Sequence, residues 1–491
     1  MPENLTQRLA EHARAEGWDE HVAFLADDRA WTFAEVFAGA ARVAGGYRAA
    51  GLSRGDRVLL ALPDSIELVW CLLGAWQAGL AAVPVNVQMS REDLTRDVKT
   101  AEPALAVVDP ETAGWLDDAA LVPTARAEEL AAAAPDPGFD GDGATPALAM
   151  FTSGTTGAPK LCFFRHRDLG GGGGRGPVLA EPGVVGLSVS RLYFFGGLGV
   201  SLFGALQGGR TSVLSRPRAT PAAALGFIRR YQVKTLFAQP SFLARLLLEP
   251  GHAEVLASLT QVTCAGEVLS ARLREQLVPI LGDRLLNVYG ATEIGGIAAG
   301  RPAAYDTPSA VGPAWDGRAV RIVDAEGRAL PQGERGELHI HVPFATRGVA
   351  RGSLEPDQLT DTWWPTGDLA SIDADEVIHV HGRLDDVEVI GGQNVVPSEV
   401  ERLLESHPRV LEAAVSAVRR PSGETSLRAY AVAVSGAGDL DELGAELIEL
   451  ARTRLSWYKV PHDVAWLDAL PRNGNSKVLR RQLRAEGNQY V

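Results

Sequence analysis

The sequence predicts an α/β protein in which a large N-terminal domain of layered sheets and helices carries a β subdomain and precedes a small α+β C-terminal domain. Apolar strand-like runs alternate with helical patterns through residues 20–290, which is typical of parallel α/β layers. Near residue 310 the pattern changes to short strands joined by turns that contain glycine or proline. A chain of 491 residues also exceeds one ordinary core, so at least two domains are expected.

The first part of the chain should alternate helices with buried strands. The run 68–85 is long and apolar enough to be weighed as a membrane span. Gly79 resembles a helix C-cap and Pro84 suits a strand end, so we expect a buried helix followed by a short buried strand. Residues 111–145, rich in Ala, Asp and Gly, predict a loosely held surface crossing. The other expected elements are a helix from Trp31 to about Ala50, strands over 57–62 and 104–108, and a helix over 90–100.

Strand ends and loops that could form a ligand site gather in the middle of the chain. Open α/β sheets bind ligands beyond the carboxyl ends of their strands. The five glycines at 170–174 are typical of a mobile loop, and we predict no site there. The expected strands lie over 147–150, 161–166, 234–240, 262–267 and 285–290, with two strand–helix units within 185–233. Further strands are expected over 320–324, 336–341, 378–382, 413–418 and 428–434, with helices over 397–406 and 439–455.

Composition restricts the partners and the compartment. The net charge is −14 and no long basic run occurs, which argues against nucleic acid. Cys71, Cys162 and Cys264 lie far apart in sequence and show neither metal-ligand spacing nor a disulfide framework, which suits a reducing cytoplasm. The polar N-terminal residues 1–20 lack the apolar core of a signal peptide. We therefore expect a cytoplasmic protein without membrane or nucleic-acid partners.

The segment 151–160, Phe-Thr-Ser-Gly-Thr-Thr-Gly-Ala-Pro-Lys, has the chemistry of a polyphosphate-binding loop. Its glycines allow close backbone approach, its hydroxyls donate hydrogen bonds and its lysine supplies positive charge. A plain linker is the alternative, but linkers rarely follow an apolar strand and end in Pro-Lys. The spacing is not that of a Walker loop. The segment resembles the phosphate loop of the acyl-adenylate-forming superfamily, which includes acyl- and aryl-CoA ligases, adenylation domains and luciferases. On this resemblance the phosphate contacts are Thr152, Ser153, Gly154, Thr155, Thr156, Gly157 and Lys160.

A second motif covers residues 289–293, Tyr-Gly-Ala-Thr-Glu. Tyr289 can stack on a purine, Thr292 can donate to a phosphate, and Glu293 can hold Mg²⁺ through hard oxygen ligands. The alternative is a Thr-Glu capping pair at the start of a helix. The run is similar to the superfamily's Tyr-Gly-x-Thr-Glu motif, which makes Thr292 and Glu293 catalytic and Tyr289, with Asn287 before it, nucleotide contacts.

Two later motifs complete the resemblance. Asp368, in Trp-Pro-Thr-Gly-Asp, can accept hydrogen bonds from both ribose hydroxyls, whereas the alternative is an ordinary turn aspartate. Arg383 matches the second ribose contact, Asp385 matches the hinge, and Lys477 matches the catalytic lysine of the superfamily. In this chain Asn475-Ser476 replaces the usual Ser-Gly before that lysine.

The acid and thiol sites follow from the same resemblance. The segment 192–199 looks most like benzoate-type CoA ligases and lacks the aspartate with which adenylation domains hold an α-amino group. The hairpin 389–394 resembles that of halobenzoate-CoA ligases and assigns Gly391 and Gly392 to the thiol tunnel. The expected acid pocket, with aromatic walls and glycine floors, is Phe194, Phe195, Gly197, Gly199, Gln239, Ala265, Gly266 and Gly290.

The resemblance implies an AMP-forming aryl- or small acyl-CoA ligase that uses ATP and Mg²⁺, forms an acyl adenylate and then transfers the acyl group to a thiol. It implies an N-terminal domain over 1–384 and a mobile C-terminal domain over 385–491. The acceptor is coenzyme A or a carrier-protein phosphopantetheine, since a stand-alone adenylation enzyme for natural-product biosynthesis would use the same first half-reaction. An amine or nitrite acceptor stays open, as do a monomer and a homodimer. A non-catalytic nucleotide-binding relative is a further alternative, and the joint presence of Glu293, Asp368, Arg383 and Lys477 argues against it.

Overall fold

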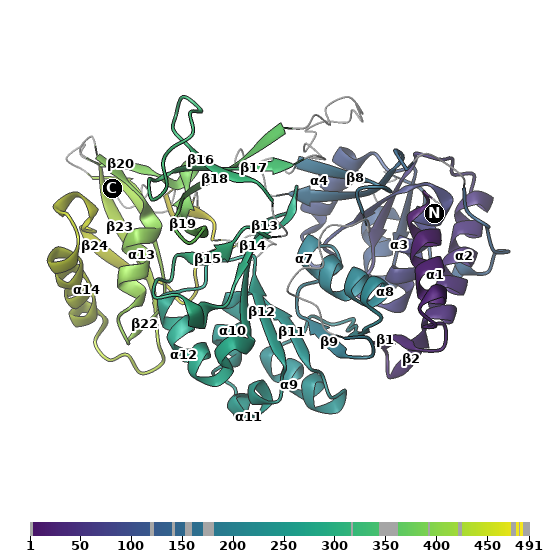
Figure 1. Cartoon of the computed structure of the whole chain (residues 1–491), viewed down its shortest axis with the longest axis horizontal. Coiled ribbons are helices and arrows are strands. Elements are labelled where there is room, and N and C mark those ends of the chain that lie inside the picture. The colour runs from purple at the N-terminus through teal and green to yellow at the C-terminus, as the bar shows by residue number, and fades with distance from the viewer. Residues whose placement is uncertain are drawn as a thin grey trace.

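A computed structural model describes residues 3–117, 122–139, 143–152, 160–169, 181–315, 318–342, 362–390, 393–420, 425–472, 478–480 and 482–484. Within these residues the fold contains sheets of eight, six, five, three and two strands. Figure 1 shows the purple-to-teal N-terminal elements at one end of the molecule and the yellow-green C-terminal elements at the other. The α/β fold class and the small C-terminal α+β domain are both as predicted.

The six-stranded sheet has the order β6-β5-β3-β4-β7-β8 and is parallel except at the edge, where β7 and β8 run antiparallel. Thr152 pairs with Lys160 at the end of that edge hairpin, so the expected phosphate loop joins β7 to β8. The loop therefore leaves a sheet edge, as predicted. The strands are β3 (Arg57–Ala61), β4 (Ala81–Pro84), β5 (Leu105–Val108), β6 (Thr124–Ala125), β7 (Pro146–Thr152) and β8 (Lys160–Arg165).

Helices around this sheet begin and end where their capping residues predict. Thr32 and Glu35 form a reciprocal capping box at the start of α2. Ser65 caps α3, which ends at Gly79 in the left-handed conformation with φ +76°. The run 68–85 is thus a buried helix and a buried strand, as predicted. The helices are α1 (Leu5–Ala15), α2 (Phe33–Ala49), α3 (Ile66–Ala78), α4 (Arg91–Ala101), α5 (Pro110–Asp117) and α6 (Ala127–Ala131).

One early prediction is wrong. Within 111–145, predicted as a loose surface crossing, lie α5, the edge strand β6 and α6. The helix α6 packs closely on α2, because a Cβ at Gly46 would lie 2.3 Å from the carbonyl oxygen of Leu130. These elements are too short to give a clear periodic pattern in the sequence, and tertiary packing stabilises them.

The eight-stranded sheet has the order β14-β13-β12-β11-β9-β10-β1-β2 and is parallel in its centre, with antiparallel hairpins at both edges. Its strands are β1 (Val22–Ala26), β2 (Arg29–Thr32), β9 (Val185–Ser188), β10 (Thr211–Val213), β11 (Thr235–Ala238), β12 (Gln261–Ala265), β13 (Leu285–Ala291) and β14 (Gly295–Gly300). Its helices are α7 (Phe195–Gly197), the π-helix η1 (Leu198–Phe203), α8 (Gly204–Gly208), α9 (Pro221–Arg230), α10 (Pro240–Leu246), α11 (His252–Ala257), α12 (Ala271–Leu281) and η2 (Gly282–Arg284).

The predicted β subdomain is an antiparallel five-stranded sheet of order β15-β19-β18-β17-β16. Its longest strand, β18, was not predicted, because Pro365 and Gly367 within it resemble turn residues. A register shift between Leu369 and Ala370 accommodates this strand in the sheet. The elements are η3 (Pro302–Ala304), β15 (Ala310–Pro313), β16 (Val320–Val323), β17 (Gly336–Val342), β18 (Thr362–Ile372) and β19 (Val377–Arg383).

The C-terminal unit packs α13 and α14 with the three-stranded sheet β22-β23-β24, and includes the hairpin β20-β21. Ile390 pairs with Gln393 in the predicted hairpin, and Gly391 and Gly392 lie outside the described residues. The elements are η6 (Leu384–Asp386), β20 (Glu388–Ile390), β21 (Gln393–Val395), α13 (Pro397–Glu405), β22 (Val410–Arg419), β23 (Thr425–Ala433), α14 (Leu440–Arg454), η7 (Trp457–Lys459) and β24 (Asp463–Trp466).

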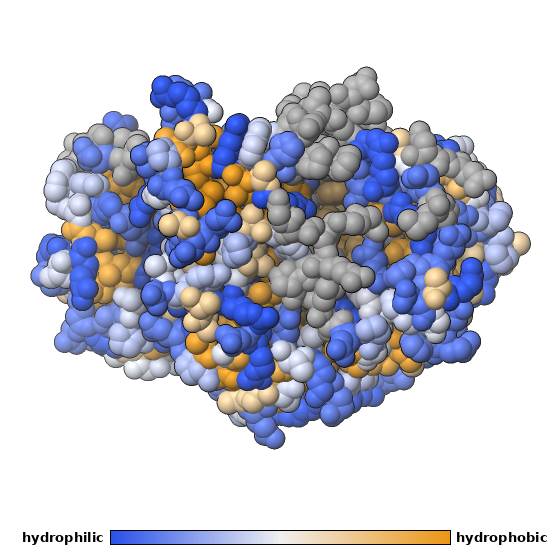
Figure 2. All heavy atoms as spheres, viewed as in Figure 1, coloured by the Kyte–Doolittle hydropathy of each residue, from blue (hydrophilic) through white to orange (hydrophobic). Residues whose placement is uncertain are grey.

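The face of the molecule shown in Figure 2 is mainly hydrophilic, with apolar side chains in separate small patches. Across the part of the chain that the structure describes, no helix has the length and apolar character that a membrane crossing requires. Cys71, Cys162 and Cys264 are all buried free thiols, as the absence of a disulfide spacing predicted.

Candidate active site

A cleft of 2360 Å³ opens at the carboxyl edge of the eight-stranded sheet. Side chains from this sheet, from the β subdomain and from the C-terminal unit all line it. Pockets for one drug-sized ligand have volumes of roughly 300–1,000 Å³, so this cleft can hold a nucleotide together with a second ligand. Its position is the one that open α/β sheets use for binding.

The ribose-binding candidates meet on one side of the cleft. Asp368 and Arg383 pair across β18 and β19, and Arg383 Nη1 lies 3.2 Å from Asp368 Oδ1. The hydroxyl of Tyr289, from β13, donates to Asp368 Oδ2. The aspartate is thus not in a turn, because it lies inside β18 with its side chain 13% exposed. Burial, followed by the charge of Asp368, raises the pKa of Tyr289, so its phenol is a proton donor at neutral pH.

Gly367 allows this arrangement. Its φ is +71°, and a Cβ there would lie 2.6 Å from Arg383 Nη2. Its backbone N–H donates to Glu337 Oε1 at 3.1 Å, while the Asp368 N–H donates to Thr366 Oγ1 at 3.1 Å. These bonds hold the strand in a shape that presents the carboxylate of Asp368 to the cleft.

Thr292 and Glu293 lie between β13 and β14 and line the cleft. The capping-pair alternative is therefore wrong, because these residues form a β-hairpin turn and no helix begins there. Asn287 is buried on β13, lines the cleft, and accepts a weak hydrogen bond from the Cys264 thiol at 3.5 Å. Among the described residues, no group of three or more His, Cys, Asp or Glu could hold a metal. One carboxylate plus phosphate oxygens and water suits Mg²⁺, so Glu293 is compatible with that ion.

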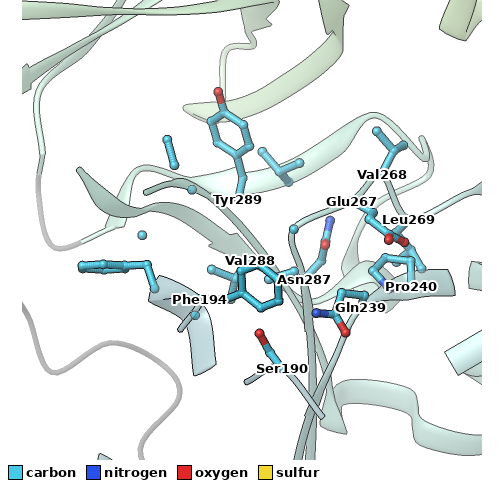
Figure 3. Close-up of a pocket in the computed structure, with 18 of the residues that line it drawn as sticks. Ser190, Phe194, Gln239, Pro240, Glu267, Val268, Leu269, Asn287, Val288 and Tyr289 are labelled. Carbon is cyan, nitrogen blue, oxygen red and sulfur yellow. The ribbon is translucent and has the colours of Figure 1, made fainter. Parts of the chain in front are cut away.

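The predicted acid pocket lies at the other end of the cleft. Figure 3 shows the ring of Phe194 beside Val288, with Tyr289 pointing away from it. Phe195 stacks on Phe164 with ring centroids 5.2 Å apart. The predicted pocket residues that line the cleft are Phe194, Phe195, Gly199, Gln239, Ala265, Gly266 and Gly290.

Gly197 was predicted as part of the pocket floor, and the structure places it elsewhere. It is buried, it does not line the cleft, and a Cβ there would lie 2.1 Å from the carbonyl oxygen of Arg191. Its absent side chain lets α7 pack onto the preceding backbone. Gly197 thus supports the pocket wall through packing and does not contact the cleft itself.

A buried ion pair fixes this wall, and the sequence did not reveal it. The carboxylate of Asp64 accepts the Leu192 N–H at 3.2 Å and lies 3.7 Å from Arg191 Nε. Arg191 also donates to the carbonyl of Ser215 and Arg216, each at 2.5 Å. Burial raises the pKa of Asp64 to about 6, against the lowering effect of Arg191. The start of the 192–199 segment is therefore held by Asp64, which binds Leu192, and by the preceding Arg191, which binds residues 215 and 216.

The C-terminal unit reaches the cleft through Arg472. Its Nη2 lies 2.9 Å from Glu412 in the same unit, and its Nη1 lies 3.9 Å from Glu267 in the large domain. Glu267 in turn accepts the N–H and the hydroxyl of Ser241, both at 2.9 Å. Asp385 also lines the cleft, with Oδ2 3.8 Å from Arg383 Nη2.

Some predicted site residues lie outside the described part of the chain. The side chains of Thr152 and Lys160 are likewise not described, although their backbones pair in the β7–β8 hairpin. The predicted residues outside the description are Ser153, Gly154, Thr155, Thr156, Gly157, Gly391, Gly392 and Lys477, together with the glycine run 170–174. One cleft residue that the sequence analysis missed is Ser190, and its signal was a polar residue directly after an apolar strand.

Comparisons with known proteins agree with this geometry. The "AMP-binding enzyme" family matches residues 11–352, and the "AMP-binding enzyme C-terminal domain" family matches residues 399–477. The p-hydroxybenzoic acid–AMP ligase FadD22 of Mycobacterium tuberculosis is 35% identical over 488 residues, which cover 98% of this chain and 69% of that protein.

Two further similarities extend over nearly whole chains. The 3-hydroxybenzoate–CoA/4-hydroxybenzoate–CoA ligase of Thauera aromatica is 29% identical over 98% of this chain and 97% of that protein. ATP-bound MatB from Rhodopseudomonas palustris has a TM-score of 0.87 at 26% identity, with 99% of each chain covered. This chain therefore belongs to the AMP-binding enzyme family and is an ATP-dependent, AMP-forming ligase.

Proposed function

We propose that this ligase activates an aromatic carboxylic acid as its acyl adenylate and then transfers the acyl group to a thiol. The observation that carries the proposal is the two-ended cleft. One end has the Tyr289–Asp368–Arg383 cluster, which suits a ribose, and the other has a wall of Phe194 and Phe195 beside small residues. Aromatic walls with small residues between them suit a flat ring.

In the first half-reaction a carboxylate oxygen attacks the α-phosphorus of ATP, and the bond to pyrophosphate breaks. No general base is needed, because a carboxylic acid is already ionised near neutral pH. Asp368 and Arg383 would orient the ribose, and Thr292 would donate to the α-phosphate. The negative charges that meet in this step would be balanced by Lys477 and by the loop 153–159. Glu293 would hold Mg²⁺, which supplies further charge neutralisation when bound.

In the second half-reaction a thiolate attacks the acyl carbon and AMP leaves. We propose that the domain boundary and hinge lie at Asp385, between residues 1–384 and 385–491, and that the small domain rotates there. Asp385 is exposed in the short η6 segment directly after β19, where a change in backbone angles disturbs little packing. The rotation would exchange Lys477 for the Gly391-Gly392 turn at the cleft.

The acceptor is proposed as a thiol, either coenzyme A or the phosphopantetheine of a carrier protein. The relatives point to more than one acceptor, since one is named for an acyl-carrier protein and another for CoA. We further propose that the enzyme works in the cytoplasm, where ATP is supplied. Three buried free thiols suit that reducing compartment.

The test is ATP–pyrophosphate exchange with a panel of benzoic, cinnamic, short-chain aliphatic and α-amino acids, followed by product analysis with CoA or a phosphopantetheinylated carrier protein. Aryl acids should support exchange, and one thiol should yield a thioester. Exchange with amino acids or aliphatic acids alone would refute the aryl assignment. Exchange without thioester formation on either thiol would refute the thiol acceptor.

A further inference from the structure

Two neighbouring strands of the eight-stranded sheet bring two polar residues level with each other at the acid end of the cleft. In the register of β9 with β11, Phe237 lies opposite Ser188. The alignment continues past the end of β9, since the Val189 N–H donates to the Phe237 carbonyl at 3.0 Å. Ser190 and Gln239 each follow two residues later, just past the ends of β9 and β11, and both reach the same edge of the sheet. Partners in a parallel register point to the same side of the sheet, and both residues line the cleft.

The same level continues across the next two strands with apolar residues. Ala238 lies opposite Cys264 in the β11–β12 register, so Gln239 lies level with Ala265. Ala265 lies opposite Val288 in the β12–β13 register. The carboxyl edge thus presents a row of four cleft residues, polar at one end and apolar at the other: Ser190, Gln239, Ala265 and Val288.

The two polar side chains of this row have no hydrogen-bond partners among the described residues. Ser190 is 4% exposed, and its backbone N–H and C=O both bond to the hydroxyl of Ser188, at 3.1 and 2.8 Å, which leaves its own hydroxyl unused. The backbone carbonyl of Gln239 accepts hydrogen bonds at the start of α10, whereas its side-chain amide has no partner within the described chain. Figure 3 shows both side chains near the ring of Phe194. Ser190 is buried and Gln239 is half-buried, and both face the cleft, so a ligand atom there can bond to both side chains.

The two ends of this row lie at different distances from the turn that carries Thr292 and Glu293. The turn with Thr292 and Glu293 follows β13, which carries the Val288 end of the row. Strands lie about 4.8 Å apart, so the Ser190 and Gln239 end lies roughly 10–14 Å across the sheet from β13. An acid whose carboxylate reacts beside Thr292 therefore points the far side of its ring towards Ser190 and Gln239.

Resting on the proposed function, we infer that the substrate is an aryl acid with a hydroxyl group on the side of the ring remote from the carboxylate, and that Ser190 and Gln239 recognise this hydroxyl. A phenolic hydroxyl can donate to Gln239 Oε1 and accept from the Ser190 hydroxyl, so it satisfies both side chains at once. An amino group mainly donates, and a methyl group does neither. Ser190 and Gln239 are thus specificity-determining residues.

The experiment compares kcat/KM for adenylate formation with 4-hydroxybenzoate, 3-hydroxybenzoate, 4-aminobenzoate, 4-methylbenzoate and benzoate. The wild-type enzyme should prefer one of the hydroxybenzoates over benzoate and 4-methylbenzoate by at least about tenfold, because an apolar analogue leaves both side chains unpaired. Ser190→Ala and Gln239→Leu should each reduce that preference by about 2–12-fold, the usual effect of losing one hydrogen bond. Thermal melting of both variants should match that of the wild type, which shows that the variants fold.

Ser241→Ala is the matched control. It removes another cleft hydroxyl, but one that already bonds to Glu267, so the ratio between hydroxybenzoate and benzoate should stay the same. Equal use of benzoate and hydroxybenzoate by the wild type, or a better rate with 4-aminobenzoate, would overturn the inference while leaving the proposed function in place. An unchanged ratio in both Ser190→Ala and Gln239→Leu would overturn it as well. Failure of every aryl acid would refute the proposed function together with this inference.

Discussion

Asp368→Asn should weaken ATP binding by removing the carboxylate that we place against the ribose. In the structure each carboxylate oxygen already has one protein donor, Arg383 at Oδ1 and Tyr289 at Oδ2. A carboxylate oxygen can accept more than one hydrogen bond, and Asp368 lines the cleft, so its oxygens can also accept from the 2′- and 3′-hydroxyls. Asparagine keeps the shape and one acceptor but replaces the other acceptor with a donor.

The expected magnitude follows from the kind of bond that is lost. A hydrogen bond to a charged group contributes about 1.5–3 kcal/mol, and about 1.4 kcal/mol corresponds to a factor of ten. The KM for ATP in pyrophosphate exchange should therefore rise by about 10–100-fold, with the KM for the acid nearly unchanged. Arg383 is 40% exposed, so the loss of its pair with Asp368 should cost little stability.

Deoxynucleotides make the assay specific for the ribose. Wild type should use 2′-deoxy-ATP or 3′-deoxy-ATP less well than ATP, and Asp368→Asn should lose most of this discrimination. Tyr289→Phe removes only the phenol–carboxylate bond and should retain the discrimination. Asp373→Asn is a matched control from the same sheet, since Asp373 bonds to His379 at 2.8 Å and does not line the cleft. If Asp368→Asn discriminates between ATP and its deoxy analogues as well as wild type does, Asp368 does not bind the ribose.

Five further variants test the rest of the protein. Gly199→Leu should raise the KM of the acid by about tenfold or more and leave ATP binding unchanged, because a Cβ there has no atom within 4 Å and the side chain would fill the acid end of the cleft. Glu293→Gln should lose adenylation activity that a higher Mg²⁺ concentration partly restores, as titration of the rate with Mg²⁺ would show. Lys477→Ala should slow adenylate formation by about 10²–10³-fold and spare thiolysis of a supplied acyl adenylate, whereas Gly391→Val should do the reverse, measured as separate half-reactions. Glu405→Gln should become more stable relative to wild type as the pH rises from 4.5 to about 8, followed by thermal melting. Burial raises the pKa of Glu405 to about 8, so within this range the unfolded wild-type chain releases a proton that the folded protein must keep, and wild-type stability falls.

For each of these predictions, one result would contradict it. Weaker ATP binding in Gly199→Leu would mean that the acid lies elsewhere, and Mg²⁺ titration without effect would remove the metal role of Glu293. Equal losses in both half-reactions for Lys477→Ala and Gly391→Val would refute the domain rotation. A constant stability difference across the pH range would mean that folding does not raise the pKa of Glu405.

Local sequence was enough to predict most elements and to group the residues that we assign to the nucleotide. The helices α2 and α3 carry their capping signals within the segment, at Thr32, Glu35, Ser65 and Gly79. The residues of the Tyr-Gly-Ala-Thr-Glu motif lie next to each other in the chain, so one strand end delivers them together. Short-range patterns report such features directly.

The acid end depends on contacts that no local pattern contains. Asp64 bonds to Leu192, 128 residues later, and thereby fixes the wall of the pocket. Ser190 and Gln239 become neighbours only through the register of β9 with β11, which the sequence does not specify. The strand β18 was missed because Gly367 looks like a turn residue, whereas its positive φ lies inside a strand. In each case tertiary structure decided what the segment does.

The contacts between the two domains allow the proposed rotation on energetic grounds. The ion pair between Arg472 and Glu267 of the large domain is long, at 3.9 Å. The closer partner of Arg472 is Glu412, at 2.9 Å, which belongs to the same domain as Arg472. Arg272 donates to the carbonyl of Val410 across the same boundary. A partly exposed ion pair contributes about 0–1 kcal/mol, and one hydrogen bond about 0.5–1.5 kcal/mol. Breaking these two contacts costs about 0.5–2.5 kcal/mol, which a ligand offsets with roughly a twofold to 70-fold preference for the rotated state, since about 1.4 kcal/mol corresponds to a factor of ten. The carbonyl of His381 also accepts hydrogen bonds from Ser398 and Arg402 across the boundary, and their loss adds a cost of the same order, which binding of the adenylate or the thiol must offset as well.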